Sequence, residues 1–235
     1  MNNGRLSIGV VGAGPVGSIL GTALAAAGHN LVGFATTDQQ NIERLDALLP
    51  GVLVKQIPEL IAKADLVLLA VPADQLEPLT TGIAEAGLWR AGQLVAHTAG
   101  QFGYGVLSAA AKAGAIPLAI HPAMSFTGTS IDLVKIRESY FAVAAPNIAL
   151  PIAQALVIEI GAEPVEVPEA DRANYFEAVS VATSFSRLVV NQAIGLLENL
   201  GLENPRGLIG PLIRSSVEQA LADGHQPIDP EELLA

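Results

Sequence analysis

The sequence GAGPVG at residues 12–17 constrains the fold of this chain more than any other feature. It follows a short apolar run, residues 6–11, and precedes a stretch of small residues that ends at Gly28. A short apolar run with such flanks is typical of a buried strand, and the small residues after it suit a helix that ends at a glycine. A second apolar stretch, residues 30–35, returns as a strand. The pattern therefore predicts a strand–helix–strand unit with a glycine turn after its first strand.

Each residue of that turn has its own role in such a unit. Gly12 permits the tight turn, Gly14 lets the backbone approach a diphosphate, and Gly17 lets the helix pack against the strand. Pro15 and Val16 begin the helix, and the fixed φ of proline suits a first helical turn. The start of the helix presents free N–H groups and a partial positive charge to an anion. We therefore predict that these five residues form a dinucleotide site, the alternative being a glycine turn without a ligand.

The end of the second predicted strand discriminates between cofactors. It carries Ala35, Thr36 and Thr37, whereas NAD sites usually place an acidic residue there to bind the ribose 2′-hydroxyl. No carboxylate stands in these three positions to repel a 2′-phosphate, and two hydroxyls can donate hydrogen bonds to it. Asp38 comes later and fits the N-cap of a helix that runs to about residue 48. The sequence therefore favours NADP over NAD.

Apolar runs alternate with helical segments over the first 168 residues. Further strands are expected at 52–54, 64–71, 94–98, 116–121, 140–144 and 164–167. Alternation at this spacing predicts an α/β fold with a doubly wound, mostly parallel Rossmann sheet.

The pattern changes beyond residue 168. Apolar residues then recur at steps of three and four from Tyr175 to Leu200, as on one face of a long helix, and a second helix is expected over residues 207–222. We therefore predict two domains, a Rossmann-like dinucleotide-binding domain at 1–168 and a small all-helical domain at 169–235.

The composition excludes several classes of function. The chain has 12 Lys and Arg against 23 Asp and Glu, and this acidic balance argues against nucleic acid and anionic membranes as partners. There is no cysteine, which excludes disulfides and thiolate chemistry, and the histidines and carboxylates show no metal-ligand spacing. Only 15% of the residues are charged, so we expect a second copy of the chain to cover apolar surface through the C-terminal helices.

The N-terminal apolar run does not have the unbroken core of a signal peptide, because glycines interrupt it. No stretch reaches the roughly 18 uninterrupted apolar residues of a membrane span. We therefore expect the cytoplasm as the location.

These motifs give the chain a resemblance to the 6-phosphogluconate-dehydrogenase-like superfamily. Within it, the chain resembles a group that has a Rossmann-like domain followed by a helical domain of unknown function. The stretches that carry the resemblance are IGVVGAGPVGSILGTALAAAGH (8–29), ADLVLLAVPADQL (64–76), VAHTAG (95–100), AIHPAMSF (119–126) and DRANYFEAV (171–179). More distant relatives are ketopantoate reductase, pyrroline-5-carboxylate reductase and prephenate dehydrogenase. The resemblance implies hydride transfer between NADP(H) and a small organic acid or imine.

Two positions depart from that group. Its members commonly have His directly after the Tyr of the DRANY-like segment, where this chain has Phe176, and Asn near the position of Ser184. The C-terminal domain is also shorter than expected. These departures concern the substrate side of the site rather than the cofactor.

Strand ends supply further cofactor candidates. Val71 and Pro72 follow a predicted strand, and the resemblance implies that this turn lines the dinucleotide, although proline also simply ends strands. Thr98 and Ala99 end the next strand at the same edge, where small residues let a nicotinamide ring lie against the backbone.

Two histidines are the catalytic candidates. His121 precedes Pro122, which holds it extended at the rim of the predicted cleft, and an imidazole with its ordinary pKa exchanges protons near neutrality. We predict that His121 is an acid/base group or a substrate donor; the alternative is a histidine that ties down the loop at 122–130. His97 either donates to substrate or cofactor, or is buried and satisfied by a backbone carbonyl.

Substrate binding is predicted at two positions. Ser125 follows the His-Pro pair. Arg187 lies on a polar stripe of the long helix, from which its planar guanidinium can hold a carboxylate, although a solvated helix face explains the same stripe. Arg137 and Arg172 are further candidates for that role.

The sequence therefore favours an NADP-dependent oxidoreductase that acts on a small anionic substrate. The alternative is a non-catalytic dinucleotide sensor or regulatory protein, for which the departure at Phe176 speaks. A scaffold without a ligand is a third interpretation, and the intact glycine turn argues against it.

Overall fold

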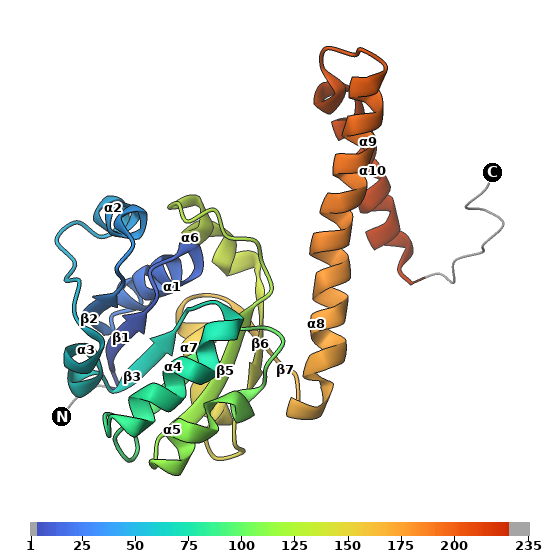
Figure 1. The fold of residues 1–235 in the computed structure, drawn as a ribbon. Helices are drawn as coiled ribbons and strands as arrows, with labels where there is room; N and C mark the ends of the chain where they lie inside the picture. Colours follow the sequence, from blue (N-terminus) through green and yellow to red (C-terminus); the bar gives the residue numbers. More distant parts are fainter. Residues whose placement is uncertain (1–3, 226–235) are drawn as a thin grey trace. The chain divides into compact units, whose positions relative to one another are not determined.

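The computed structural model describes residues 4–225, and residue contacts divide the chain into two compact units, Met1–Glu177 and Ala178–Ala235. The first unit is built on one seven-stranded sheet in the order β2-β1-β3-β4-β5-β6-β7 (Figure 1). All neighbouring strands are parallel except β5 and β6. The predicted fold class is confirmed. The strands are β1 (Ser7–Val11), β2 (Asn30–Ala35), β3 (Leu66–Leu69), β4 (Leu94–His97), β5 (Ile116–Pro122), β6 (Tyr140–Ala144) and β7 (Glu163–Glu166).

Helices cover both faces of this sheet. Side chains of α1, α2 and α7 pack on one face, and those of α3, α4 and α5 pack on the other. The helices are α1 (Pro15–Ala26), α2 (Gln39–Leu48), α3 (Ile57–Lys63), α4 (Ala73–Glu85), α5 (Ser108–Lys112), α6 (Ile131–Lys135), α7 (Leu150–Glu159) and α8 (Arg172–Ser180). Three 3₁₀ turns, η1 (Tyr104–Leu107), η2 (Ile136–Glu138) and η3 (Glu169–Asp171), connect them.

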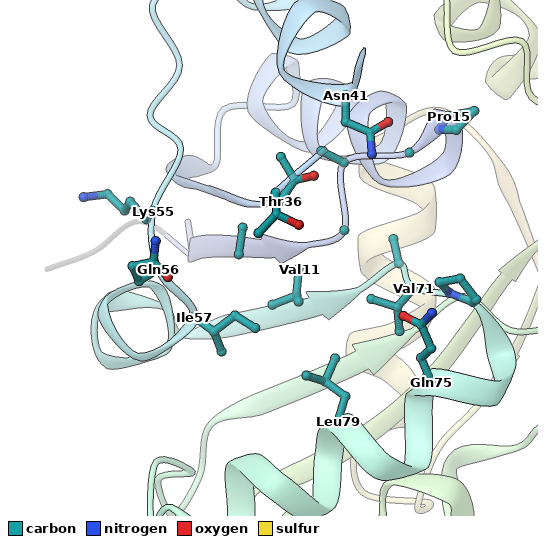
Figure 2. Close-up of a pocket in the computed structure, with 17 residues that line it drawn as sticks. Val11, Pro15, Thr36, Asn41, Lys55, Gln56, Ile57, Val71, Gln75 and Leu79 are labelled. Carbon is teal, nitrogen blue, oxygen red and sulfur yellow. The ribbon is translucent and has the colours of Figure 1, made fainter. Parts of the chain in front are cut away.

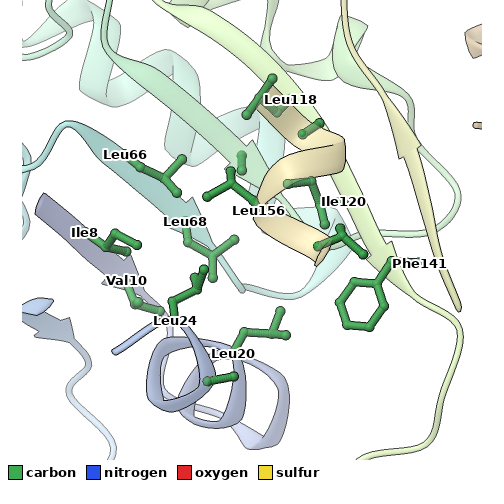
Figure 3. Packing of buried hydrophobic residues seen from close by; sticks show 14 of the residues in the cluster. Ile8, Val10, Leu20, Leu24, Leu66, Leu68, Leu118, Ile120, Phe141 and Leu156 are labelled. Carbon is green, nitrogen blue, oxygen red and sulfur yellow. The ribbon is translucent and has the colours of Figure 1, made fainter. Parts of the chain in front are cut away.

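The hydrophobic core is double because successive strand residues point to opposite faces. In β3, Leu66 and Leu68 belong to one buried cluster, and Val67 and Leu69 belong to the other. A strand that is apolar at every position is therefore buried on both faces, as parallel sheets require. Figure 3 shows one of the two clusters, with labelled residues Ile8, Val10, Leu20, Leu24, Leu66, Leu68, Leu118, Ile120, Phe141 and Leu156.

The strand predicted at 52–54 is wrong. The structure has a single bridge there, between Phe34 and Val54, and the N–H of Lys55 donates to the Phe34 carbonyl at 2.8 Å. The segment cannot extend into a ladder because it follows Gly51, whose φ is +79°, and leads directly into α3. The other predicted strands are present, and their ends lie within two residues of the expected ones.

The first unit extends beyond the domain boundary predicted at residues 168 and 169. Arg172, the first residue of α8, is buried and donates from Nε to the carbonyl of Val167 at 3.2 Å and from Nη2 to that of Ala142 at 3.4 Å. These bonds attach the start of α8 to β6 and to the segment after β7. The contact-based division accordingly lies after Glu177.

The second unit contains the π-helical turn η4 (Val181–Phe185), then α9 (Ser186–Asn199) and α10 (Pro205–Asp223). The single long helix predicted here is therefore interrupted by a π turn. Within residues 178–225 the only buried residue is Pro205, so this unit has no hydrophobic core of its own. Across residues 4–225, no helix combines the length and the apolar content needed to cross a membrane.

Candidate functional site

A cleft of about 580 Å³ opens at the carboxyl ends of β1, β2 and β3. Helix α1 leads from β1 to β2 on one side, and the chain then returns to β3 on the other side of β1. Ligands of open α/β sheets bind at such a switch in strand order. The cleft is lined by Val11, Gly12, Ala13, Gly14, Pro15, Ala35, Thr36, Thr37, Asn41, Lys55, Gln56, Ile57, Ala70, Val71, Pro72, Gln75 and Leu79.

The three glycine positions of the turn require glycine for different structural reasons. Gly12 has a φ of +95°, and a Cβ there would lie 2.3 Å from the Ala70 carbonyl oxygen. A Cβ on Gly17 would lie 2.0 Å from the carbonyl oxygen of Gly12. A Cβ on Gly14 would meet nothing within 4 Å. Backbone packing thus requires Gly12 and Gly17, whereas at Gly14 the missing side chain leaves space for a ligand.

The start of α1 offers donors to that space. Gly14 is the N-cap, no side chain caps the helix, and the N–H of Ser18 donates to the Gly14 carbonyl at 3.0 Å. The N–H groups of Val16 and Gly17 therefore precede the first intrahelical bond and are available to an anion. The side chain of Val16 packs on the core instead of lining the cleft, so its predicted cofactor role is confined to its backbone.

The end of β2 forms the polar part of the cleft. Figure 2 shows Thr36 and Asn41 on one side of it and Val71 and Gln75 on the other. Asp38 caps α2 as predicted, because its Oδ1 accepts from the N–H of Gln40 at 2.8 Å. Among the described residues that line the cleft there is no Asp or Glu.

Of two basic residues near the cleft, one lines it and the other lies behind the glycine turn. Lys55 lines it, and its Nζ lies 2.6 Å from Oε1 of Glu59. Arg44 lies behind the glycine turn, where Nη1 donates to the Ala13 carbonyl at 3.4 Å and to the side chain of Asn41. Lys55 and Gln56 are not predictable as lining residues because the loop between α2 and α3 has no sequence pattern of its own, and Asn41 reads only as a polar residue of α2.

His121 lies in a second polar cluster, at the end of β5. Its Nδ1 is 2.7 Å from the hydroxyl oxygen of Tyr175, and the two rings meet edge to face. Burial, and then the charge of Arg172, lower the pKa of His121 from 6.5 to about 4. This corrects the expectation of an imidazole that titrates near neutrality: at neutral pH the ring is uncharged. A Cβ on Gly100 would lie 2.8 Å from His121 Nε2, so this glycine makes room for the ring.

Sequence reasoning missed Tyr175, which was assigned only to the apolar face of a helix. Tyr175 is half-buried, and burial raises the pKa of its hydroxyl. The Arg172 guanidinium lies 5.9 Å from the centre of its ring. The DRANY segment thus brings a hydroxyl and a cation to the end of β5.

His97 is fully buried and satisfied by the backbone. The N–H of Ala99 donates to Nδ1 at 3.2 Å, so Nε2 carries the proton and donates to the Gly103 carbonyl at 2.9 Å. Burial lowers the pKa of His97 to about 4. Both ring nitrogens are occupied, which favours the structural alternative over a catalytic role for this residue.

The loop at 122–130 is held by a buried carboxylate rather than by His121. Oδ2 of Asp132 accepts from the N–H groups of Thr127 and Gly128, both at 2.8 Å, and Oδ1 accepts from the Thr127 hydroxyl. Ser125 is exposed on this loop.

The remaining predicted residues lie apart. Val71 and Pro72 line the cleft, whereas Thr98 and Ala99 do not, and Ala99 packs against the second core cluster. Arg187 is exposed on α9, in the second unit. Within residues 4–225, no group of three or more His, Cys, Asp or Glu side chains is placed to hold a metal ion.

The glycine turn, the uncapped helix and the switch point together define a Rossmann-type α/β class of protein. A family model described as a Rossmann-like domain matches residues 1–122, more than half of the chain, and the chain belongs to this family. A model described as a domain of unknown function, DUF2520, matches residues 139–228. The resemblance to a group that has a Rossmann-like domain followed by a domain of unknown function is therefore confirmed.

Solved structures share the fold at low identity. A Bacteroides fragilis protein provisionally described as an NADP oxidoreductase is 19% identical, with 92% of this chain and 80% of that chain covered and a TM-score of 0.73. Pyrroline carboxylate reductase of Plasmodium falciparum with NADP bound is 18% identical, with 97% and 82% covered and a TM-score of 0.63. An imine reductase of Streptomyces aurantiacus is 16% identical, with 91% and 74% covered and a TM-score of 0.67. No curated protein matches the chain.

Proposed function

We propose that this protein is an NADP-dependent oxidoreductase that transfers hydride to or from a small anionic organic substrate. The observation that carries this proposal is the cleft at the switch point, where an uncapped helix start faces open space at Gly14. Structures of the same fold that are described as NADP-bound or as reductases support it.

The diphosphate of the cofactor would be held by the backbone at the start of α1. The free N–H groups of Val16 and Gly17 lie at the N-terminal end of α1, where the helix dipole is positive and favours an anion. The space next to Gly14 suits a diphosphate, because any side chain at position 14 would fill it. No other group of the described chain occupies this space.

The 2′-phosphate of NADP would lie at the end of β2. Thr36 and Thr37 can donate hydroxyl hydrogen bonds there. Lys55 also lines the cleft, but its ammonium group is paired with Glu59 at 2.6 Å and contributes no free charge. Asp38 is engaged in capping α2 and is absent from the lining. Two hydroxyls in a described lining without a carboxylate favour the cofactor with the extra phosphate.

The reacting half of the site would extend from Val71 and Pro72 toward the ends of β4 and β5, past Thr98 and Ala99. NADP(H) supplies or accepts the hydride when it is bound. His121 would donate its Nδ1 proton to the hydroxyl oxygen of Tyr175, 2.7 Å away, and the hydroxyl proton of Tyr175 would then be free to hydrogen-bond to the substrate. Ser125 would contribute a hydrogen bond from the neighbouring loop.

Two copies of the chain would pair through the C-terminal helices. The second unit exposes apolar side chains along both of its helices and buries only Pro205. A helical hairpin without a core is not stable by itself in water, so a second copy is the covering surface that the sequence itself supplies. Sedimentation of the full chain should show a dimer, and a monomer with a folded second unit would contradict this assignment. The exposed apolar residues include Phe185, Leu188, Leu196, Leu200, Leu208 and Leu212.

Thermal stability with each cofactor tests the proposed function. A ligand that binds only the native state raises the melting temperature by mass action, so NADP should stabilise the protein more than NAD does. Stabilisation by NAD alone would contradict the cofactor assignment. Oxidation of NADPH with a panel of small keto acids then separates an enzyme from a sensor. Binding of the cofactor without turnover of any compound would favour the regulatory alternative. That alternative is supported by Phe176, which stands where the similar group commonly has His.

A further inference from the structure

Arg172 is a buried cation that forms no ion pair within the described part of the chain. The residue is 2% exposed, its Nε and Nη2 donate to two backbone carbonyls, and its buried Nη1 has no hydrogen-bond partner among residues 4–225. The ion pairs of residues 4–225 involve other basic residues. Burying a charge in this way costs free energy unless an opposite charge compensates it.

The neighbouring groups supply only part of that compensation. The charge of Glu169 acts favourably on Arg172, but Glu169 is exposed, forms no ion pair with the guanidinium within residues 4–225, and its Oε1 accepts from the N–H of Gly105 at 3.1 Å. Tyr175, His121 and His97 also surround the guanidinium, and all three are neutral at neutral pH. Among these four side chains Arg172 is therefore the charged one, and within residues 4–225 its buried Nη1 has no partner.

The same cluster contains hydrogen-bonding groups with exposed edges. Tyr175 and His121 are half-buried, so a small molecule can reach them from solvent, and Arg172 lies 5.9 Å from the Tyr175 ring. A hydroxyl, an imidazole and a guanidinium that is only partly compensated together are suited to an anion of carboxylate size.

We propose that Arg172, Tyr175 and His121 form a binding site for the carboxylate of a small organic acid. Arg172 supplies the charge, and the Tyr175 hydroxyl donates a hydrogen bond while its oxygen accepts from the Nδ1–H of His121. This assignment rests on the proposed function in one respect only: the bound acid is the substrate of the oxidoreductase. It gives the carboxylate to Arg172 of the first unit rather than to Arg187 on α9.

The test uses pyruvate as the probe and pyruvamide, its uncharged analogue, as the chemical control. The full chain is labelled with ¹⁵N-histidine, and the His121 signals are followed during titration, with and without NADP. Pyruvate should shift them saturably, because an anion that neutralises Arg172 changes the field at the His121 ring; pyruvamide should not. The same anion should raise the pKa of His121 in the complex, since the charge of Arg172 is, after burial, the influence that lowers it. The neutral His97 on β4 is the other titratable ring near this cluster.

Substitutions of single arginines identify which cation binds the carboxylate of pyruvate. Arg172→Gln should abolish the pyruvate response, Arg172→Lys should weaken it, and Arg206→Gln, which removes an exposed cation of α10, should leave it unchanged. If Arg172→Gln does not fold, Tyr175→Phe serves in its place and should weaken pyruvate binding severalfold. The response should survive in Arg187→Gln.

Three outcomes would overturn the proposal. The first is a pyruvate response equal to that of pyruvamide, and the second is a response that is lost in Arg187→Gln but kept in Arg172→Gln. The third is the absence of a saturable shift of the His121 signals up to about 0.1 M pyruvate, a concentration at which a dissociation constant a hundredfold weaker than millimolar is still detected. A lack of pyruvate binding together with normal NADP binding rejects this site alone. A lack of NADP binding rejects the proposed function, whatever pyruvate does.

Discussion

The Nδ1 atom of His121 and the hydroxyl oxygen of Tyr175 are 2.7 Å apart, although 54 residues separate them in the sequence. The bond joins the end of β5 to the start of α8. It places a neutral imidazole and a phenol next to each other at the edge of the sheet where ligands of this fold bind. A histidine that cannot hold a second proton near neutrality can still act through the hydroxyl that it orients.

Removing that hydroxyl is expected to affect both stability and turnover. Tyr175→Phe leaves a partly buried imidazole nitrogen without its partner and should lower the free energy of unfolding by about 1 kcal/mol. Urea unfolding measures this change. On any substrate found in the NADPH screen, the variant should lose turnover while its affinity for NADP stays within about twofold. Full turnover in Tyr175→Phe would remove the residue from the proton pathway.

Stability should fall on mild acidification. Burial lowers the pKa of His97 to about 4, and burial with Arg172 does the same for His121, from an ordinary value of 6.5. Between these values the unfolded chain binds more protons, so the free energy of unfolding should be constant above about pH 7 and should fall below pH 6.5, by at most about 1.4 kcal/mol per pH unit for each histidine. Urea unfolding between about pH 7 and pH 5 measures this slope. His97→Asn should reduce it by about half, and a flat profile in the unaltered protein would show that the two rings are not buried neutral.

Asp132 should be the polar residue on which the loop at 122–130 depends. Its carboxylate is fully buried and accepts bonds from two N–H groups and one hydroxyl, so Asp132→Asn should cost about 2–3 kcal/mol of unfolding free energy. Asp38→Asn is the matched control, because asparagine caps a helix about as well as aspartate and should change stability by less than about 0.5 kcal/mol. Equal effects of the two substitutions would mean that the loop is held by other contacts.

A carboxylate at the end of β2 should reverse the cofactor preference. Thr36 lines the cleft, and an acidic side chain there would repel a 2′-phosphate and accept a hydrogen bond from a ribose hydroxyl. Thr36→Asp should weaken NADP binding by about tenfold or more and leave NAD binding equal or tighter. Thr36→Val, which loses the hydroxyl without adding charge, should weaken NADP binding less. Calorimetric titration of both variants with both cofactors makes the comparison, and unchanged NADP affinity in Thr36→Asp would place the 2′-phosphate elsewhere.

Local patterns made much of this fold predictable. The glycines of the turn, the Asp38 cap and the doubly buried β3 all follow from neighbouring residues, and the structure has them where they were expected. The short run at 52–54 was over-interpreted because three apolar residues do not distinguish a strand from a single bridge. The antiparallel pairing of β5 and β6 has no local signature, since a buried strand reads the same in either direction.

The second polar cluster was harder to predict because its properties come from tertiary contacts. His121 was identified from the proline that follows it, but its lowered pKa depends on burial and on Arg172, which is distant in sequence. Tyr175 fits the apolar face of its helix equally well, and only the folded chain shows its hydroxyl against His121. Lys55 lines the cleft from a loop whose path no sequence pattern specifies.

Calorimetric titration of NADP into the unaltered chain, a Gly14→Val variant and a Gly82→Val variant tests the central claim most directly. A Cβ meets no atom within 4 Å at either position, so neither substitution creates a clash in the folded protein, but only position 14 faces the diphosphate space. We expect saturable binding to the unaltered chain and to Gly82→Val, and at least a ~100-fold loss with Gly14→Val, which corresponds to about 2.7 kcal/mol. Equal binding by all three proteins would contradict a dinucleotide site at this turn.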